Sequence, residues 1–287
     1  MTGEPMTYWP APAKLNLFLH IVGRRPDGYH LLQTCFQFVD LCDELGLRVR
    51  ADGRIARVKD VDGVAADADL SVRAARALQH AAACRLGVDI DVRKRIPIGA
   101  GLGGGSSDAA TTLLVLNRLW NLAWTVERLA VLGLTLGADV PVFVRGRAAW
   151  AEGVGERLVP LLPPLAPAET KYLILKPKVS ISTAAVFGDP ELTRNTPAIT
   201  IAGFLAAGGH NDCEPVVRRR YPEVASALDH LSRFGRARLT GTGACVFLDC
   251  GSDERGLEIM RHTPAEWGAF VVRGRNDSPL LQRLESG

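Results

Sequence analysis

The stretch PIGAGLGGGSSDAATTLL, residues 97–114, decides how the fold of this chain is interpreted. Five of its first nine residues are glycine, two serines follow, and the apolar spacing then becomes helical. Glycine at this density costs backbone entropy, so a close approach or a left-handed conformation must require it. A strand that leads through a glycine turn into a helix presents free backbone N–H groups and the helix dipole to an anion. The stretch therefore predicts a phosphate site rather than a simple packing turn.

Two common phosphate loops fit this stretch poorly. A Walker loop needs a Gly-Lys pair, which occurs nowhere in the sequence. Gly99, Gly101 and Gly104 satisfy the dinucleotide pattern G-x-G-x-x-G, but that pattern also needs an acidic residue about 20 positions later at a strand end. Trp124 and Thr125 stand in that region instead, and the loop lies in mid-domain. A dinucleotide-dependent oxidoreductase is therefore the weaker alternative.

Composition places the chain among soluble globular proteins. It has 287 residues, of which 47% are hydrophobic and 23% are charged. At about 150 residues per domain, this length predicts two domains. No apolar run reaches the ~18 residues that a membrane span needs, and the N-terminus lacks a signal-peptide pattern. We therefore expect a cytoplasmic protein that does not associate with a membrane.

Charge and cysteine usage exclude further classes of function. The formal net charge is only +3, and the basic run Arg218–Arg220 is expected to be a solvated helix face, so nucleic acid is not an expected partner. The six cysteines include no C-x-x-C pair, and the histidines show no metal-binding spacing. We expect neither a structural zinc site nor a disulfide framework.

Hydrophobic periodicity predicts strands and helices in both halves of the chain. Residues 13–23 alternate with a period of two, which predicts a strand with one buried face and with Lys14, Asn16 and His20 together on the other face. Further strands are expected at 42–51, 88–94, 172–177, 238–250 and 268–274, and helices at 72–86, 108–120, 125–137 and around 222–234.

Turn and cap residues mark the boundaries of these elements. Ser71 is the expected cap of the first helix, and Ser106 or Ser107 that of the helix after the glycine loop. Asp139 precedes Pro141 and two expected strands. The segment 160–170 holds four prolines in eleven residues, which predicts a stiff linker. We therefore expect an α+β fold, an α/β sandwich, with domains at 1–163 and 164–287.

The glycine loop also resembles a third kind of phosphate loop. Its pattern P-x-x-x-G-L-G-S/G-S-S, from Pro97 to Ser107, is similar to that of the galactokinase, homoserine kinase, mevalonate kinase and phosphomevalonate kinase (GHMP) superfamily. Three further blocks fit one branch of it in order: PAPAKLNLFLHIVGRRPDGYH at 10–30, LTLGADVPVFVRG at 134–146 and RLTGTGACVF at 238–247. The resemblance covers nearly the whole chain, from about Pro10 to Ser278.

The resemblance implies a two-domain GHMP-kinase-like architecture and a specific reaction. The expected activity is ATP-dependent phosphorylation of the 2-hydroxyl of 4-diphosphocytidyl-2-C-methyl-D-erythritol in the non-mevalonate isoprenoid pathway. Homoserine or mevalonate is the alternative acceptor within the superfamily. Mg²⁺ is expected to accompany ATP, and the chain is expected to act as a monomer or homodimer.

The resemblance further implies a catalytic pair, Lys14 and Asp139. Asp139 would accept the hydroxyl proton, and Lys14 would orient that carboxylate and stabilise the developing alkoxide. Judged from the residues alone, a lysine among alternating leucines could instead extend to solvent. Asp139 alone could equally cap a helix.

The remaining site residues also follow from the resemblance. ATP would be held by Pro97, Ile98, Gly99, Ala100, Gly101, Leu102, Gly103, Gly104, Gly105, Ser106 and Ser107. The cytidyl substrate would be held by Asn16, Tyr29, His30, Thr183, Phe187, Thr242 and Gly243, with the aromatic rings around the base. A packed tyrosine after a turn is the alternative role for Tyr29. Asp69 stands where an asparagine is often found, and Asp108 is expected to point away from phosphate.

Overall fold

The computed structural model describes residues 5–286, and in this part of the chain ten strands form a single sheet. Its main path runs β3-β4-β2-β10-β7-β9-β8, with β1 and β5 also paired to β2 and β6 paired to β5. The strands are β1 (Thr7–Arg24), β2 (His30–Arg50), β3 (Ile55–Arg57), β4 (Gly87–Arg93), β5 (Ala149–Glu152), β6 (Arg157–Pro160), β7 (Lys171–Lys176), β8 (Ala237–Leu239), β9 (Val246–Asp249) and β10 (Gly268–Arg275). The expected α+β class is confirmed.

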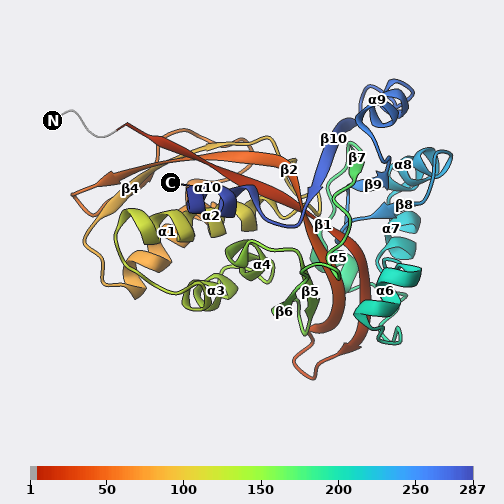
Figure 1. Ribbon diagram of the computed structural model, residues 1–287, viewed down its shortest axis with the longest axis horizontal. Coiled ribbons are helices and arrows are strands. Elements are labelled where there is room, and N and C mark those ends of the chain that lie inside the picture. Colours follow the sequence, from red (N-terminus) through yellow and green to blue (C-terminus); the bar gives the residue numbers. More distant parts are fainter. Residues whose placement is uncertain (1–4, 287) are drawn as a thin grey trace.

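Helices cover the sheet in two groups (Figure 1). The first group is η1 (Ala66–Ala68), α1 (Leu70–Ala81), α2 (Gly104–Leu119), α3 (Val126–Leu134) and α4 (Val140–Arg145). The second is α5 (Thr183–Phe187), α6 (Ile201–Ala207), α7 (Glu214–Arg220), α8 (Pro222–Ser232) and α9 (Asp253–Arg261). The last helix, α10 (Pro279–Ser286), follows the second group in the chain but lies beside α2 and β1 (Figure 1).

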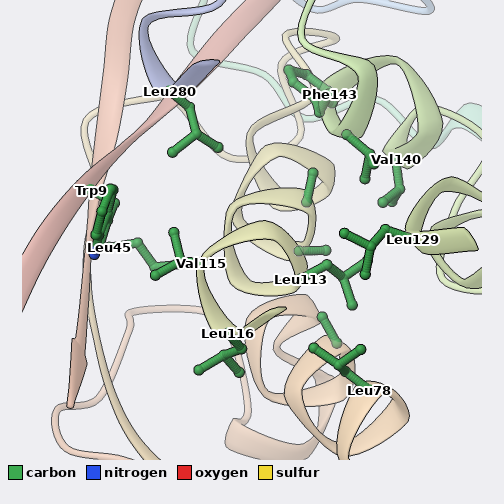
Figure 2. Close-up of a cluster of buried hydrophobic side chains, with 14 of the residues drawn as sticks. Trp9, Leu45, Leu78, Leu113, Val115, Leu116, Leu129, Val140, Phe143 and Leu280 are labelled. Atoms are coloured by element: carbon green, nitrogen blue, oxygen red, sulfur yellow. The ribbon is translucent and has the colours of Figure 1, made fainter. Parts of the chain in front are cut away.

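Each group of helices packs over its own hydrophobic core. In the first core, Leu113 and Leu116 of α2 pack with Leu78 of α1, and Leu280 of α10 adds to the same cluster (Figure 2). The second core is built from β7, β8, β9 and the helices α7 to α9. A third cluster joins them through Leu15, Phe18 and neighbours from both halves. The proposed boundary between residues 163 and 164 stays a prediction, although α10 packs on the first core.

The strand β1 departs from the expectation of one buried face. Lys14 and Asn16 are buried, as are the neighbouring Leu15 and Leu17. The ladder with β2 is interrupted by register shifts, one of which lies between Asn16 and Leu19. A β-bulge of this kind turns the following side chains out of the simple alternation. His20 therefore packs against Phe18, away from the cavity that Lys14 and Asn16 line, although the sequence predicted a shared face.

Three local predictions were wrong at element boundaries. Asp69 rather than Ser71 caps α1, because its carboxylate accepts the Ser71 N–H at 2.9 Å. Gly103, in the left-handed conformation with φ 74°, stands at the N-cap of α2 in place of either serine. The segment after Asp139 first forms α4, and the two expected strands, β5 and β6, follow that helix.

Candidate active site

A cavity of about 990 Å³ lies between the first part of the chain and two segments of the later part, residues 183–188 and 241–242. Most of the residues predicted for the site line it: Lys14, Asn16, Tyr29, His30, Pro97, Ile98, Gly99, Ala100, Gly101, Gly103, Gly104, Gly105, Ser106, Asp139, Thr183, Phe187 and Thr242. Segments from β1, β2, the glycine loop, the start of α4 and α5 thus meet around one space. Three predicted residues, Leu102, Ser107 and Gly243, lie outside its lining.

Lys14 is the centre of the polar floor of this cavity. Its ammonium donates to Asn16 Oδ1 at 2.5 Å and to the Gly101 carbonyl at 3.1 Å, and lies 3.3 Å from Asp139 Oδ2. The Lys14 side chain is only 4% exposed, whereas that of Asp139 is 34% exposed. The Asp139 carboxylate is therefore accessible to a molecule in the cavity, while the buried Lys14 ammonium is fixed by its bonds to Asn16 and Gly101.

A second layer of hydrogen bonds sets the orientation of Asn16. Its Nδ2 donates to the Thr34 hydroxyl at 2.9 Å, and that hydroxyl donates to the Phe18 carbonyl. The amide oxygen of Asn16 is consequently the atom that faces Lys14. The Asn16 backbone N–H donates to Thr240 Oγ1 at 3.0 Å, which links β1 to the second half of the chain.

The glycine loop reaches α2 through three residues with positive φ, Gly99, Gly101 and Gly103. Lys14 N–H donates to the Leu102 carbonyl at 3.0 Å, so β1 is tied directly to the loop. A Cβ at Gly101 would overlap the Thr240 carbonyl oxygen, which explains why this position needs glycine. The loop ends at the N-terminus of α2, where free N–H groups favour an anion.

The predicted loop residues Leu102 and Ser107 are buried beneath the cavity. Leu102 belongs to the hydrophobic cluster that joins the two halves, and Ser107 begins the buried face of α2. Gly243 packs near Ile181 and Leu239, while its neighbour Thr242 faces the cavity and bonds to the Thr183 hydroxyl at 3.0 Å. Leu102, Ser107 and Gly243 can affect ligand binding by fixing the backbone conformation of the residues that line the cavity.

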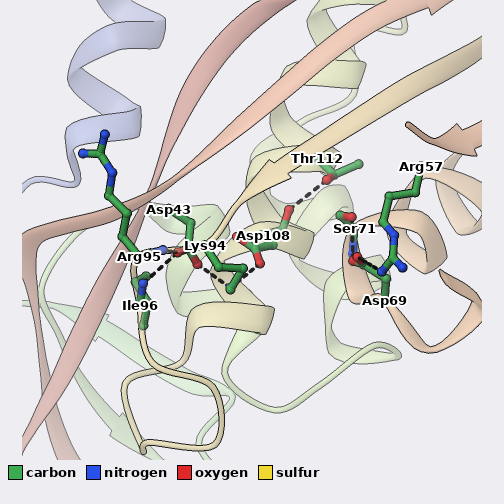
Figure 3. Close-up of polar contacts among 9 residues, drawn as sticks. All are labelled: Asp43, Arg57, Asp69, Ser71, Lys94, Arg95, Ile96, Asp108 and Thr112. Carbon is green, nitrogen blue, oxygen red and sulfur yellow. Dashed lines mark hydrogen bonds and ion pairs between the residues drawn. The ribbon is translucent and has the colours of Figure 1, made fainter. Parts of the chain in front are cut away.

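A buried charge cluster lies beside the loop (Figure 3). The Lys94 ammonium bonds to Asp43 and, at 2.7 Å, to Asp108 Oδ2. Asp43 also accepts the backbone N–H groups of Arg95 and Ile96, at 2.6 and 2.8 Å, so it anchors the chain as it enters the loop. Burial raises the pKa of Asp108 to about 7, against the opposing charge of Lys94.

Two acids that the sequence singled out belong to this wall. Asp108 lines the cavity, but its carboxylate is buried and its Oδ2 accepts from Lys94, so the expectation that it points away from phosphate stays a prediction. Asp69 also lines the cavity. It pairs with Arg57 at 3.1 Å and accepts from the Ser71 hydroxyl at 2.6 Å (Figure 3). Both of its oxygens are thus engaged within the protein.

Part of the cavity is lined by the aromatic rings of Tyr29, His30 and Phe187, and we call this part the aromatic end. Tyr29 follows the turn between β1 and β2 and is 64% exposed, so the structure does not support a packed tyrosine. His30 and Phe187 stack with ring centroids 5.1 Å apart and an interplanar angle of 24°. Arg194 Nε donates to His30 Nε2 at 3.0 Å. Burial lowers the pKa of His30, and the nearby charges of Arg194 and Arg24 lower it further.

Comparisons with known proteins agree with this arrangement. The GHMP kinases N terminal domain family matches residues 69–147, and the GHMP kinases C terminal family matches residues 197–265. The chain is 56% identical over 280 residues to 4-diphosphocytidyl-2-C-methyl-D-erythritol kinase of Nitrosococcus oceani, covering 98% of this chain and 99% of that protein. The chain belongs to the 4-diphosphocytidyl-2-C-methyl-D-erythritol kinase family. The relative from Pseudomonas syringae pv. syringae is also 56% identical, over 281 residues covering 98% of each chain.

Solved structures support the same family and the wider fold. The crystal structure of 4-(cytidine 5'-diphospho)-2C-methyl-D-erythritol kinase has a TM-score of 0.80 and 33% identity, covering 93% of this chain and 99% of that one. The mevalonate kinase of Methanococcus jannaschii has a TM-score of 0.71 at 16% identity, covering 95% and 99%, and shares the fold. The predicted two-domain GHMP architecture and the class of ATP-dependent small-molecule kinase are confirmed. The oxidoreductase alternative is excluded.

Sequence reasoning missed three residues that support this kinase site: Thr34, Lys94 and Arg194. Lys94 had a readable signal, because a lysine at the end of a strand directly precedes the loop. Thr34 and Arg194 had none, since their roles depend on partners far away in the chain. Their contacts cross 18 and 164 positions of sequence.

Within residues 5–286, no group of three or more His, Cys, Asp or Glu side chains could hold a metal ion. None of the helices in the same part of the chain has the length and apolarity to cross a bilayer.

Proposed function

We propose that this kinase transfers the γ-phosphoryl group of ATP to the 2-hydroxyl of 4-diphosphocytidyl-2-C-methyl-D-erythritol. The observation that carries the proposal is the Lys14–Asp139 pair, which lines one cavity with the glycine loop and the aromatic end. A phosphate donor on the loop and a base at the aromatic end would bracket this pair. Two relatives bear the name of this activity, and each matches this chain over nearly its full length.

The catalytic work assigned to the pair is proton transfer and charge stabilisation. Asp139 would accept the hydroxyl proton as the oxygen attacks, because its carboxylate is the exposed member of the pair. Lys14 would hold that carboxylate in place and stabilise the negative charge that develops on the oxygen. Phosphoryl transfer needs little covalent participation by the protein, so alignment and electrostatics account for most of the rate.

The loop and the start of α2 would hold the triphosphate. Backbone N–H groups there are free to bind phosphate oxygens, and the helix dipole adds to the attraction. Mg²⁺ binds readily through phosphates with one or two protein oxygens, so the absence of a three-ligand cluster among residues 5–286 is compatible with it. Ser106, which lines the cavity in the first turn of α2, would supply one such oxygen. The ion would neutralise charge on the β- and γ-phosphates.

The aromatic end distinguishes this substrate from the smaller acceptors of the superfamily. Homoserine and mevalonate have no ring that could stack on an aromatic side chain. The ring of Tyr29 is exposed, and both Tyr29 and Phe187 line the cavity. Stacking on aromatic side chains is a general way to hold a nucleobase. Asn16, Thr183 and Thr242 would provide polar contacts for the rest of the substrate.

A substrate panel tests the proposal directly. ADP release is measured with ATP and each of three acceptors: the cytidyl substrate, homoserine and mevalonate. We expect turnover with the cytidyl substrate alone. Turnover with mevalonate and none with the cytidyl substrate would reject the proposal. A matched panel with 2-C-methyl-D-erythritol 4-phosphate, which lacks the cytidyl group, measures how much the base contributes.

We also propose that the enzyme works in the cytoplasm, as a monomer or a homodimer. All six cysteines are free, as suits a reducing compartment, and the reaction consumes ATP, which that compartment supplies. Light scattering coupled to size-exclusion chromatography would give the oligomeric state, and cell fractionation would give the location.

A further inference from the structure

Arg194 lies behind the aromatic end of the cavity and uses each of its nitrogens. Nε donates to His30 Nε2 at 3.0 Å, and Nη1 donates to the Leu192 carbonyl at 2.9 Å. Nη2 donates to the carbonyls of Phe187 and Asp189, at 3.1 and 2.6 Å. The guanidinium therefore connects the two residues of the stacked pair. It binds the ring nitrogen of His30 and the backbone carbonyl of Phe187.

The chemistry of this contact determines the tautomer of His30. An arginine side chain has donors and no acceptor, and it stays charged. His30 Nε2 must therefore be the lone-pair nitrogen, so the single ring proton of the neutral imidazole sits on Nδ1. The cation beside the ring also opposes its protonation, since the Arg194 charge contributes to the lowered pKa of His30. The ring is consequently neutral, and its one N–H is at Nδ1.

The turn that carries Arg194 is itself fixed to the second half of the molecule. Asp189 is buried, and its carboxylate binds Arg219 Nη2 at 3.1 Å and Arg220 Nε at 2.6 Å. It also accepts the Glu191 backbone N–H at 2.9 Å. The arginine run of α7, expected to be a solvated face, therefore anchors the segment between α5 and α6. His30 belongs to β2 in the first half, so Arg194 bridges the two halves.

We propose that Arg194 is a positioning residue for base recognition. It holds His30 neutral, protonated on Nδ1 and parallel to Phe187, so that this wall of the cavity offers an N–H donor. A base with an unprotonated ring nitrogen and a carbonyl oxygen, as in a cytidyl group, presents matching acceptors. This role rests on the proposed function, because a substrate without a base would have no use for it.

The first test measures the histidine itself and needs no substrate. Side-chain ¹⁵N–¹H correlation spectra distinguish the two neutral tautomers, and the His30→Gln variant assigns the signal by its disappearance. We expect an Nδ1-protonated ring in the wild-type enzyme. In Arg194→Met, which preserves the apolar bulk, we expect mixed tautomers and a higher His30 pKa, because a nearby cation is gone. An Nε2-protonated ring in the wild-type enzyme would overturn the proposal.

The second test separates the two substrates by steady-state kinetics. In Arg194→Met, KM for the cytidyl substrate should rise about tenfold, the size of one lost hydrogen bond, while KM for ATP changes less than about twofold. Equal rises in both values would indicate general damage to the fold and contradict the proposal. Unchanged KM for the cytidyl substrate would also contradict it.

A second arginine–histidine pair in the chain provides the matched control. Arg233, at the C-cap of α8, contacts Nδ1 of His230 in the same helix, and neither residue lines the cavity. Arg233→Met should alter the His230 signal and leave both KM values unchanged. If the wild-type enzyme turned over only a substrate without a base, the proposed function would fail, whereas the tautomer measurement would still report whether Arg194 controls His30.

Discussion

At the scale of single residues, the site depends on side chains that are buried and yet polar. Lys14, Asn16 and Thr34 are almost completely removed from solvent, and each has a partner at hydrogen-bond distance. A buried polar group is costly unless it is paired, so the chain of partners is what allows a charged amine to sit inside a strand. The same chain leaves one exposed group, the Asp139 carboxylate, for the reaction.

Replacement of that carboxylate should separate chemistry from binding. We expect Asp139→Asn to lower kcat by at least ~10²-fold, because the amide cannot accept the hydroxyl proton. ATP should still bind with nearly the wild-type dissociation constant, as measured by calorimetry. A variant with near-normal kcat would remove Asp139 from the proton transfer.

Thr34 tests whether the orientation of Asn16 matters. Thr34→Val keeps the shape of the side chain and removes the hydroxyl that accepts from Asn16 Nδ2. We expect a loss of roughly 1–3 kcal/mol in the free energy of unfolding, because a buried donor is left unpaired. The kcat value should fall as well, since Asn16 Oδ1 is no longer held toward Lys14. Thr34→Ser retains the hydroxyl, and chemical denaturation should show it close to wild type in stability.

At the scale of elements, acidic side chains hold two of the element ends around the site. Asp69 caps α1, and Asp43 binds two backbone N–H groups where the chain leaves β4 for the glycine loop. Lys94 joins Asp43 to Asp108, near the start of α2 (Figure 3). The position of the loop is thus determined by a buried cluster of one cation and two acids, beyond what the glycines alone allow.

This cluster should make stability depend on pH. Burial raises the pKa of Asp108 in the folded protein to about 7, with Asp43 and Asp69 adding to the shift and Lys94 opposing it. The unfolded carboxyl releases its proton near pH ~4, so the folded state binds more protons between these values. Stability should therefore fall as pH rises through this window, by up to about 1.4 kcal/mol per pH unit.

The Asp108→Asn variant isolates this contribution. Its side chain does not titrate, so the difference in unfolding free energy between wild type and variant should change steadily from pH 4 to pH ~7 and then level off. Urea denaturation at several pH values measures the difference. Asp62→Asn, at an exposed position in a turn, is the control and should follow the wild-type profile. Parallel profiles for wild type and Asp108→Asn would show that Asp108 does not titrate as described.

At the scale of the whole molecule, the two halves meet at the glycine loop. Cys245 N–H donates to the Ala100 carbonyl at 3.1 Å, and Thr240 Oγ1 lies 3.4 Å from the Gly101 carbonyl. The backbone of Gly101 passes so close to Thr240 that no side chain fits. The placement of the two halves relative to each other therefore also determines the shape of the phosphate site.

Two alanine variants of the loop separate backbone strain from this contact. Gly101→Ala combines a φ of +76° with an overlap on the Thr240 carbonyl, whereas Gly99→Ala has a φ of +64° and no atom within 4 Å of the new Cβ. Strain alone costs roughly 1–2 kcal/mol. We expect Gly99→Ala to lose about that much stability, and Gly101→Ala to lose more and to raise KM for ATP at least ~10-fold. Similar losses in both variants would mean that contact between the halves is unimportant here.

Local patterns in the sequence were sufficient for the class of site and for most elements. Glycines before a helix indicate a phosphate because backbone N–H groups and a dipole are local features. Alternation predicted β1, and apolar spacing predicted α2, because both depend on neighbours within a few residues. Even so, the placement of His20 could not be predicted, because a bulge in β1 is set by pairing with β2.

Only the tertiary structure decided which polar groups share one cavity. The sequence by itself determined an α+β chain with an anion loop, and its motif blocks pointed to the kinase family. The resemblance implied the Lys14–Asp139 pair, but nothing in the sequence indicated that Lys94 joins Asp43 to Asp108 or that Arg194 reaches His30. The Lys94–Asp43 and Arg194–His30 contacts join residues 51 and 164 positions apart in the chain. Their energies depend on burial and on distances of a few ångströms, which no local pattern encodes.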